Sequence, residues 1–198
     1  MTFWDFCSPI YDFAQKRNAN YDKWNDTIIK YIDMDNTVLE LAGGTGEISM
    51  RISHKAKRIV CTDLSDKMLK MAQKKARNSN NISFEVADLY NLNYDDSSFD
   101  VVIASQVLHL LDNPQKAIAE IKRVAKERII LPICLLKDIR GFAKFQINIW
   151  KLLGFTPKHT FDKESYISFL ESYGLIISDA VVIEGSMPII VVVCKNSG

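Results

Sequence analysis

Short apolar runs alternate with amphipathic segments along most of the chain. Five runs rich in Val, Ile and Leu predict strands, at 37–43, 58–64, 82–88, 99–106 and 128–134. Residues 46–55, 65–78 and 113–126 predict the intervening helices, because their apolar side chains recur at helical spacing. Strands without a polar face are buried on both sides, so the pattern predicts an α/β protein with a doubly wound, mostly parallel sheet and helices on both faces.

The last third of the chain departs from this alternation. Helices are predicted at 142–153 and 163–172, followed by two apolar runs at 175–185 and 187–196. A short Gly-Ser turn joins these two runs, which is typical of an antiparallel hairpin. We expect the hairpin at the edge of the sheet.

Composition excludes several classes of protein. The 25 basic and 24 acidic residues leave a net charge of +1, without the basic excess of nucleic-acid-binding proteins, so no nucleic-acid partner is expected. The four cysteines are widely spaced and read as reduced thiols, and no metal site is predicted. The longest apolar runs are far shorter than the roughly 20 residues that span a bilayer, and no secretion signal is recognised. We therefore expect a cytoplasmic protein of 198 residues in one domain.

A glycine-rich turn follows the first predicted strand, where residues 38–49 read VLELAGGTGEIS. Gly43, Gly44 and Gly46 leave the backbone bare at the place where open α/β sheets bind ligands. No lysine follows to complete a P-loop, which excludes nucleoside triphosphates. Gly44, Gly46 and Ser49 nearly match the spacing of the dinucleotide motif, so NAD remains an alternative ligand.

Two acidic residues stand at the ends of the next two predicted strands. Asp63 is placed to accept both hydrogens of a ribose diol, and Asp88 to accept from an exocyclic amino group such as that of adenine. Together they fit one adenosine. The alternative for each is a structural role, with Asp88 capping the turn that follows it.

Four stretches in order, VLELAGGTG, CTDLSDKML, EVADLYNL and FDVVIASQVLHLLDNPQKAIAEIKRV, resemble the class I S-adenosylmethionine-dependent methyltransferases. The resemblance is to the small-molecule branch that includes ubiquinone-biosynthesis enzymes, and it implies a Rossmann-like fold and S-adenosylmethionine as cofactor. Two departures stand out. Ala42 replaces the family's usual first glycine, and residues 126–134 lack the usual glycine pair before the fifth strand.

The resemblance also implies roles for individual residues. The methionine end of the cofactor would lie against Glu40, Ala42, Gly43, Gly44, Gly46 and Ser105, the ribose against Asp63, and the adenine against Leu64, Met68, Asp88 and Leu89, with Tyr11 in an N-terminal helix folded over the cofactor. The expected organisation is an N-terminal helical cap (1–35), a cofactor-binding core (36–136), a substrate-side insertion (137–162) and a C-terminal helix and hairpin (163–198).

Methyl transfer by in-line displacement chiefly requires alignment and a dry pocket. An oxygen acceptor or a protonated amine would also need a base, and His109 is the candidate because it follows the fourth predicted strand. The alternative for His109 is a helix residue hydrogen-bonded to backbone. His159 has no assigned role, and His54 is expected at the surface.

The absence of two known motifs limits the classes of methyl acceptor that we expect. The [DN]-P-P-[YF] clamp of nucleic-acid amino-methylating enzymes is replaced by ASQV at 104–107, and the Pro-Cys pair of cytosine-C5 enzymes is missing, which favours a small-molecule acceptor. The apolar stretch 141–155 predicts either a roof over a hydrophobic acceptor pocket or a core helix, with lipid contact as a weaker alternative. An NAD-dependent oxidoreductase and a non-catalytic S-adenosylmethionine-binding protein remain rival hypotheses.

Overall fold

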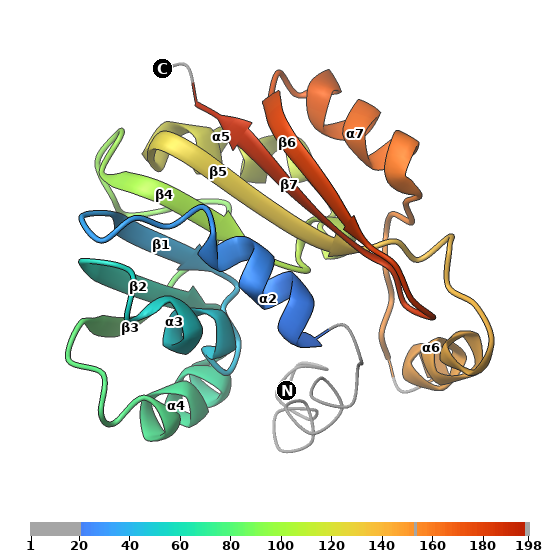
Figure 1. Ribbon diagram of the computed structural model, residues 1–198, viewed down its shortest axis with the longest axis horizontal. Coiled ribbons are helices and arrows are strands. Elements are labelled where there is room, and N and C mark those ends of the chain that lie inside the picture. Colours follow the sequence, from blue (N-terminus) through green and yellow to red (C-terminus); the bar gives the residue numbers. More distant parts are fainter. Residues whose placement is uncertain (1–20, 153, 197–198) are drawn as a thin grey trace.

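The computed structural model describes residues 21–152 and 154–196. Its seven-stranded sheet has the order β3-β2-β1-β4-β5-β7-β6 (Figure 1). The strands are β1 (Thr37–Leu41), β2 (Arg58–Asp63), β3 (Ile82–Val86), β4 (Phe99–Ala104), β5 (Ala125–Cys134), β6 (Ile176–Ile183) and β7 (Ile189–Lys195). Strand β7 runs antiparallel to both β5 and β6, whereas β1 to β5 pair in parallel. The predicted doubly wound sheet with an antiparallel C-terminal hairpin strand is confirmed.

Helices connect these strands at nearly the predicted places. They are α2 (Tyr21–Ile29), α3 (Glu47–Ile52), α4 (Asp66–Lys75), α5 (Pro114–Val124), α6 (Phe142–Leu152), α7 (Lys163–Ser172) and the short 3₁₀ helix η1 (Leu108–Leu110). Helix α4 starts at the predicted cap, where the Ser65 hydroxyl accepts a hydrogen bond from the Met68 N–H at 3.3 Å. Within the described ranges, no helix is both long and apolar enough to cross a bilayer.

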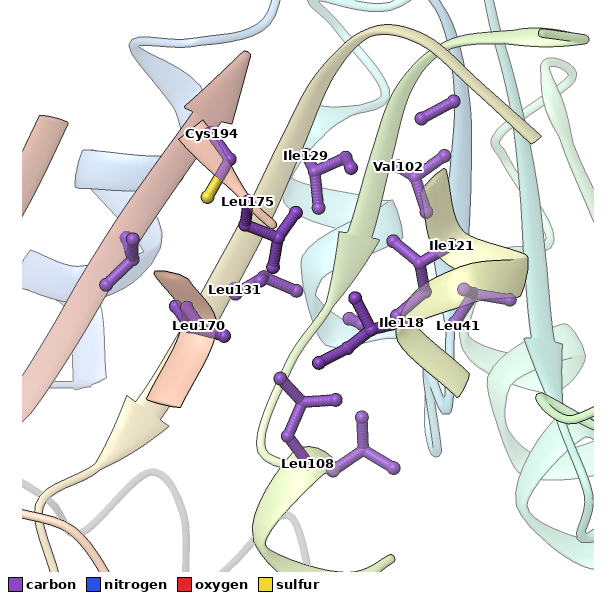
Figure 2. Packing of buried hydrophobic residues seen from close by; sticks show 14 of the residues in the cluster. Leu41, Val102, Leu108, Ile118, Ile121, Ile129, Leu131, Leu170, Leu175 and Cys194 are labelled. Atoms are coloured by element: carbon purple, nitrogen blue, oxygen red, sulfur yellow. The ribbon is translucent and has the colours of Figure 1, made fainter. Parts of the chain in front are cut away.

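The central strands of the sheet are buried on both faces, as their unbroken apolar runs predict, whereas the edge strands β3 and β6 are largely half-buried or exposed. In β4, Val101 and Ile103 point to one face, and Val102 and Ala104 point to the other. Helices α5 and α7 pack on the second face, where Figure 2 shows Ile118, Ile121 and Leu170 against strand residues such as Val102, Ile129 and Leu131. Helices α2 and α3 pack on the first face, together with Ala143 of α6.

The order of the strands reverses at β1. The chain moves outward from β1 to β2 and β3, then returns to place β4 on the other side of β1. The carboxyl ends of β1 and β4 meet where Leu41 pairs with Ala104. Because the connections leave in opposite directions from this point, a crevice opens above it, where sheets of this class bind ligands.

Candidate functional site

A cavity of about 240 Å³ lies at the carboxyl ends of β1, β2 and β4. Eight of the residues predicted to bind a cofactor line it: Ala42, Gly44, Asp63, Leu64, Met68, Asp88, Leu89 and Ser105. Eight further lining residues were not predicted: Leu41, Thr62, Ala87, Tyr90, Gln106, Val107, Leu110 and Leu111. The topology thus brings together segments that are far apart in the sequence, and most of the side chains they contribute are apolar.

The three glycines of the loop after β1 serve different purposes. A Cβ at Gly43 would lie 2.5 Å from the Cys61 Sγ, and one at Gly46 (φ +74°) would lie 3.0 Å from the Ala72 Cβ of α4. These two glycines therefore permit close packing behind the loop. A Cβ at Gly44 (φ +57°) would meet no atom within 4 Å, so the bare backbone that a ligand can approach is at Gly44.

Ala42 adopts a left-handed backbone conformation, with φ of 51°. A side chain in this region costs on the order of 1 kcal/mol relative to glycine. The loop keeps its shape despite this strain. The Gly43 N–H donates to the Thr62 carbonyl of β2 at 2.8 Å, and the Gly46 N–H donates to the Gly43 carbonyl at 2.9 Å.

The Asp63 carboxylate is fixed between the glycine loop and the start of α4. Its Oδ2 accepts a hydrogen bond from the Gly44 N–H at 2.9 Å, and its Oδ1 accepts one from the Ser65 N–H at 2.8 Å. Carboxylate oxygens can accept more than one hydrogen bond each, so the group can also receive hydroxyl hydrogens from a ligand. The carboxylate is therefore held ready at the cavity wall.

Asp88 has the predicted capping role and also lies at the cavity, where its contact with an amino group stays a prediction. It lines the cavity, and its Oδ1 also accepts a hydrogen bond from the Tyr90 N–H at 2.9 Å, which caps the turn after β3. Leu64, whose side chain is 69% exposed, lines the same cavity. An apolar side chain beside the two carboxylates can pack against a flat ring bound in the cavity.

Glu40 lies behind the loop and does not line the cavity. Its Oε2 accepts hydrogen bonds from the Ser49 N–H, at 2.9 Å, and from the Ser49 hydroxyl. Burial raises the pKa of this carboxyl to about 7. The Ser49 N–H in the first turn of α3 is thereby bound within the protein. Glu40, Gly43 and Gly46 shape the loop from behind, and their contact with a cofactor stays a prediction.

Ser105 and Gln106 form the wall at the end of β4. The Ser105 Oγ is buried and has no hydrogen-bond partner in the part of the chain that the structure describes. A buried hydroxyl without a partner costs about 1 to 3 kcal/mol, so its place at the cavity fits a polar group of a ligand.

Gln106 holds this wall in position. With φ of 55°, it donates from its N–H to the Pro132 carbonyl at 2.9 Å, and its side-chain oxygen accepts from the Cys134 N–H at 2.9 Å. These two bonds join the end of β4 to β5. A left-handed glutamine cannot be recognised in a sequence, which is why this residue was not predicted.

Comparison with known proteins assigns the family. A methyltransferase-domain family model matches residues 39–131. The YqeM protein of Bacillus subtilis is 32% identical over 173 residues, covering 86% of this chain and 66% of YqeM. The ubiquinone/menaquinone biosynthesis C-methyltransferase UbiE of Rickettsia rickettsii is 30% identical over 168 residues, covering 77% of this chain and 67% of UbiE. The chain belongs to the class I S-adenosylmethionine-dependent methyltransferases.

A solved structure shows the same fold. Magnesium protoporphyrin IX methyltransferase (ChlM) of Synechocystis PCC 6803, which holds bound S-adenosylhomocysteine, superposes with a TM-score of 0.68 at 17% identity, over 90% of this chain and 84% of ChlM. The cofactor of this methyltransferase is S-adenosylmethionine, and the NAD alternative is set aside. The unpartnered Ser105 hydroxyl, the open space at Gly44 and the fixed Asp63 carboxylate fit such a ligand.

His109 lies behind the cavity wall of this methyltransferase. It belongs to η1, next to Leu110 and Leu111, which line the cavity, but it is itself buried and is not a lining residue. Its ring packs edge-on against Phe155, with centroids 5.8 Å apart, and its Nδ1 has no hydrogen-bond partner among the described residues. Burial and the nearby His159 lower the pKa of His109 to about 4. Its role as a base stays a prediction.

Two other expectations concern Tyr11 and the apolar stretch 141–155. Tyr11 lies outside the described residues, so its proposed place over the cofactor stays a prediction. The stretch 141–155 does not form a core helix, because Ala143 is the one residue of α6 that is fully buried. None of the residues that line this cavity comes from the described part of this stretch, and its place as a roof over an acceptor pocket stays a prediction.

Proposed function

We propose that this methyltransferase transfers the methyl group of S-adenosylmethionine to a small, largely apolar molecule that enters the cavity beside Ser105. The observation that carries this proposal is the cavity itself. Two carboxylates stand on its β2 and β3 side, and apolar residues of the segment after β4 stand opposite them. A ligand pocket with few polar groups on apolar walls suits a small molecule better than a polymer.

The cofactor has a proposed position in this cavity. The Asp63 carboxylate holds the ribose hydroxyls, the adenine packs between Leu64 and Met68, and its amino group donates to Asp88, with Leu89 against the ring edge. The loop from Ala42 to Gly44 and the Ser105 hydroxyl bind the methionine end. The lining positions of these side chains and the unpartnered Oγ of Ser105 support this arrangement.

S-adenosylmethionine supplies a methyl group that is activated by its attachment to a positively charged sulfur. The residues around it need only bind, orient and exclude water, since alignment accounts for much of the rate in such a displacement. Ser105 orients the amino-acid end. Val107, Leu110 and Leu111 form an apolar surface on which the acceptor rests, with its attacking atom directed at the methyl group.

The names of the relatives support a small acceptor. UbiE is named for ubiquinone and menaquinone biosynthesis, and ChlM for a porphyrin. The test is transfer of a labelled methyl group to a panel of demethylated quinone precursors, simple phenols and amines, with duplex DNA and RNA as controls. Transfer to at least one small molecule is expected. Transfer to nucleic acid alone would contradict the proposal.

His109 is the proposed base where the acceptor must lose a proton. Replacing His109 with Phe keeps an aromatic ring beside Phe155 and removes the basic nitrogens. Loss of a general base lowers kcat by a factor of about 10² to 10⁴. The control is an acceptor that needs no deprotonation, because kcat with this acceptor should not change in the variant. A kcat within about threefold of the unmodified enzyme for both acceptors would reject the role of His109 as base.

A further inference from the structure

Helix α6 carries an exposed apolar face that the function above does not use. Seven of its eleven residues are apolar, yet Ala143 is the one that is fully buried. Phe142 is 72% exposed, Phe145 59%, Ile149 40% and Leu152 88%. At about 100° per residue, these four side chains fall within an arc of about 80° on one side of the helix. They form one stripe, which we call the outer face of α6.

The opposite side of α6 attaches the helix to the protein. Ala143 belongs to the core cluster that also contains Ile183 and Ile189 of the β6–β7 hairpin, and Ile147 packs against this cluster. Figure 1 shows α6 at the periphery, below the end of this hairpin and away from the helices that cover the sheet. The outer face is therefore directed away from the core.

Basic residues surround this helix. Residues 137–158 contain five Lys or Arg and a single acid, Asp138, whereas the whole chain has 25 basic and 24 acidic residues. The remainder of the chain therefore has more acids than bases, so basic residues are concentrated here. Lys137 and Lys158 form ion pairs with Asp162 and Asp112, which leaves Arg140, Lys144 and Lys151 as the source of the local positive charge. On α6, Lys144 and Lys151 lie within about 20° of each other on the helix circumference, between the attached side and the outer face.

We propose that α6 binds the surface of an anionic lipid bilayer. The outer face would enter the boundary between headgroups and acyl chains, while Lys144 and Lys151 would extend to the lipid phosphates. A short helix with Phe and Leu on one side, Lys beside them and no acidic residue has the features of an interfacial helix. The helix lies on the bilayer and does not cross it.

Two features favour lipid over another occupant. An exposed patch of four large apolar side chains requires a partner, and a fluid bilayer accepts such a stripe without a complementary shape. The concentration of basic charge beside it matches a negatively charged surface and would repel the same face of a second copy of this chain.

The test is flotation of the 198-residue chain with vesicles of phosphatidylcholine, alone or mixed with phosphatidylglycerol. Binding is expected to the mixed vesicles, to weaken as salt is added, and to be much weaker for phosphatidylcholine alone. Phe145→Glu combined with Leu152→Glu should reduce binding at least tenfold. Lys144→Gln combined with Lys151→Gln should reduce it by about fivefold for each lysine removed, on the mixed vesicles only.

The matched control introduces two glutamates at exposed apolar positions outside α6. Met34→Glu combined with Ile176→Glu alters two exposed apolar residues outside α6, which are 72% and 55% exposed, and should leave vesicle binding unchanged. S-adenosylmethionine affinity, measured by calorimetry, should be unchanged in every variant and shows that each is folded.

Several outcomes would overturn the proposal. They are no binding to either vesicle, equal binding by the α6 variants and the unmodified chain, or a dimer in solution that Phe145→Glu with Leu152→Glu dissociates. The last result would assign the outer face to a second copy of this chain.

Discussion

At the scale of single residues, the site depends on groups that are held in place before any ligand binds. Asp63 receives two backbone hydrogen bonds, from Gly44 and Ser65, so its carboxylate cannot turn away from the cavity without losing both. A fixed carboxylate loses little side-chain entropy when it binds a ribose, which makes its hydrogen bonds more favourable. We therefore expect Asp63 to contribute a large share of the cofactor affinity.

Replacing Asp63 with Ala should weaken S-adenosylmethionine binding by roughly 1.5 to 3 kcal/mol, the range for a lost hydrogen bond to a charged group. Isothermal titration calorimetry measures the change. Asp66→Ala is the matched control, because Asp66 is an exposed carboxylate three residues further on, in an ion pair with Lys70. It should leave the affinity within about 0.5 kcal/mol. Equal affinity for the two variants would refute the ribose assignment.

Residue identity in the sequence indicated which groups reach the cavity, but not how the backbone presents them. Asp63 and Asp88 were predicted because each ends a predicted strand, and Ser105 because of the resemblance to the methyltransferase family; the structure places all three at the cavity. Gln106 was missed because its importance comes from a positive φ and from a bond to β5. Glu40 was expected against the cofactor; its side chain binds Ser49 behind the loop, and its contact with the cofactor stays a prediction.

At the scale of elements, the glycine loop couples β1 to its neighbour β2. The thiol of Cys61, which is buried in β2, fills the space beside Gly43. Ala72 of α4 similarly fills the space beside Gly46. The loop keeps its position because two different elements occupy the volume that side chains would need. Changes on β2 or α4 are therefore expected to alter the cofactor site without touching the ligand.

Gly43→Ala should destabilise the protein by about 1 to 3 kcal/mol, because the added Cβ would meet the Cys61 Sγ at 2.5 Å. Cys61→Ala removes that sulfur. The double variant should therefore lose less unfolding free energy than the two single variants together, by at least about 1 kcal/mol. Denaturant unfolding of all four proteins measures this coupling.

Gly44 provides the control for that cycle. Gly44→Ala is strained by its φ of +57° but has no atom within 4 Å of the added Cβ. The change in unfolding free energy caused by Gly44→Ala should therefore add to the change caused by Cys61→Ala. Coupling of similar size for Gly43 and Gly44 would show that the strain lies in the loop backbone and not in the contact with Cys61.

Most elements could be predicted because a buried parallel strand reads as an unbroken apolar run. β2 and α7 match their predicted positions to within one residue. Helix α3 is shorter than the predicted 46–55 and ends at Ile52. The short η1 was missed because three residues carry no periodicity, and α6 gave no sign of its position because its apolar residues fit a core helix and a surface helix equally well.

At the scale of the whole molecule, buried ionisable groups link stability to pH. Burial holds the pKa of His109 at about 4 in the folded protein, against 6.5 for an unperturbed histidine. Between these values the unfolded chain binds a proton that the folded protein excludes. Stability that is present above pH 6.5 is therefore lost as the pH falls toward 4.

His109→Phe removes this linkage and should flatten the pH dependence. Relative to the variant, the unmodified protein should lose up to about 3 kcal/mol of unfolding free energy as the pH falls through this range. Denaturant unfolding at several pH values measures both proteins. His54→Phe is the control, because His54 is exposed and should not alter the slope. Parallel curves for His109→Phe and the unmodified protein would show that folding does not lower the pKa of His109.

The central claim is that S-adenosylmethionine binds in the cavity formed where β1, β2 and β4 end. A crystal structure with S-adenosylhomocysteine tests it most directly. Both ribose hydroxyls are expected to lie about 2.7 Å from the Asp63 carboxylate, with the adenine between Leu64 and Met68 and the amino-acid end at Ser105. A nucleoside bound elsewhere, or bound in the cavity with its ribose away from Asp63, would contradict it.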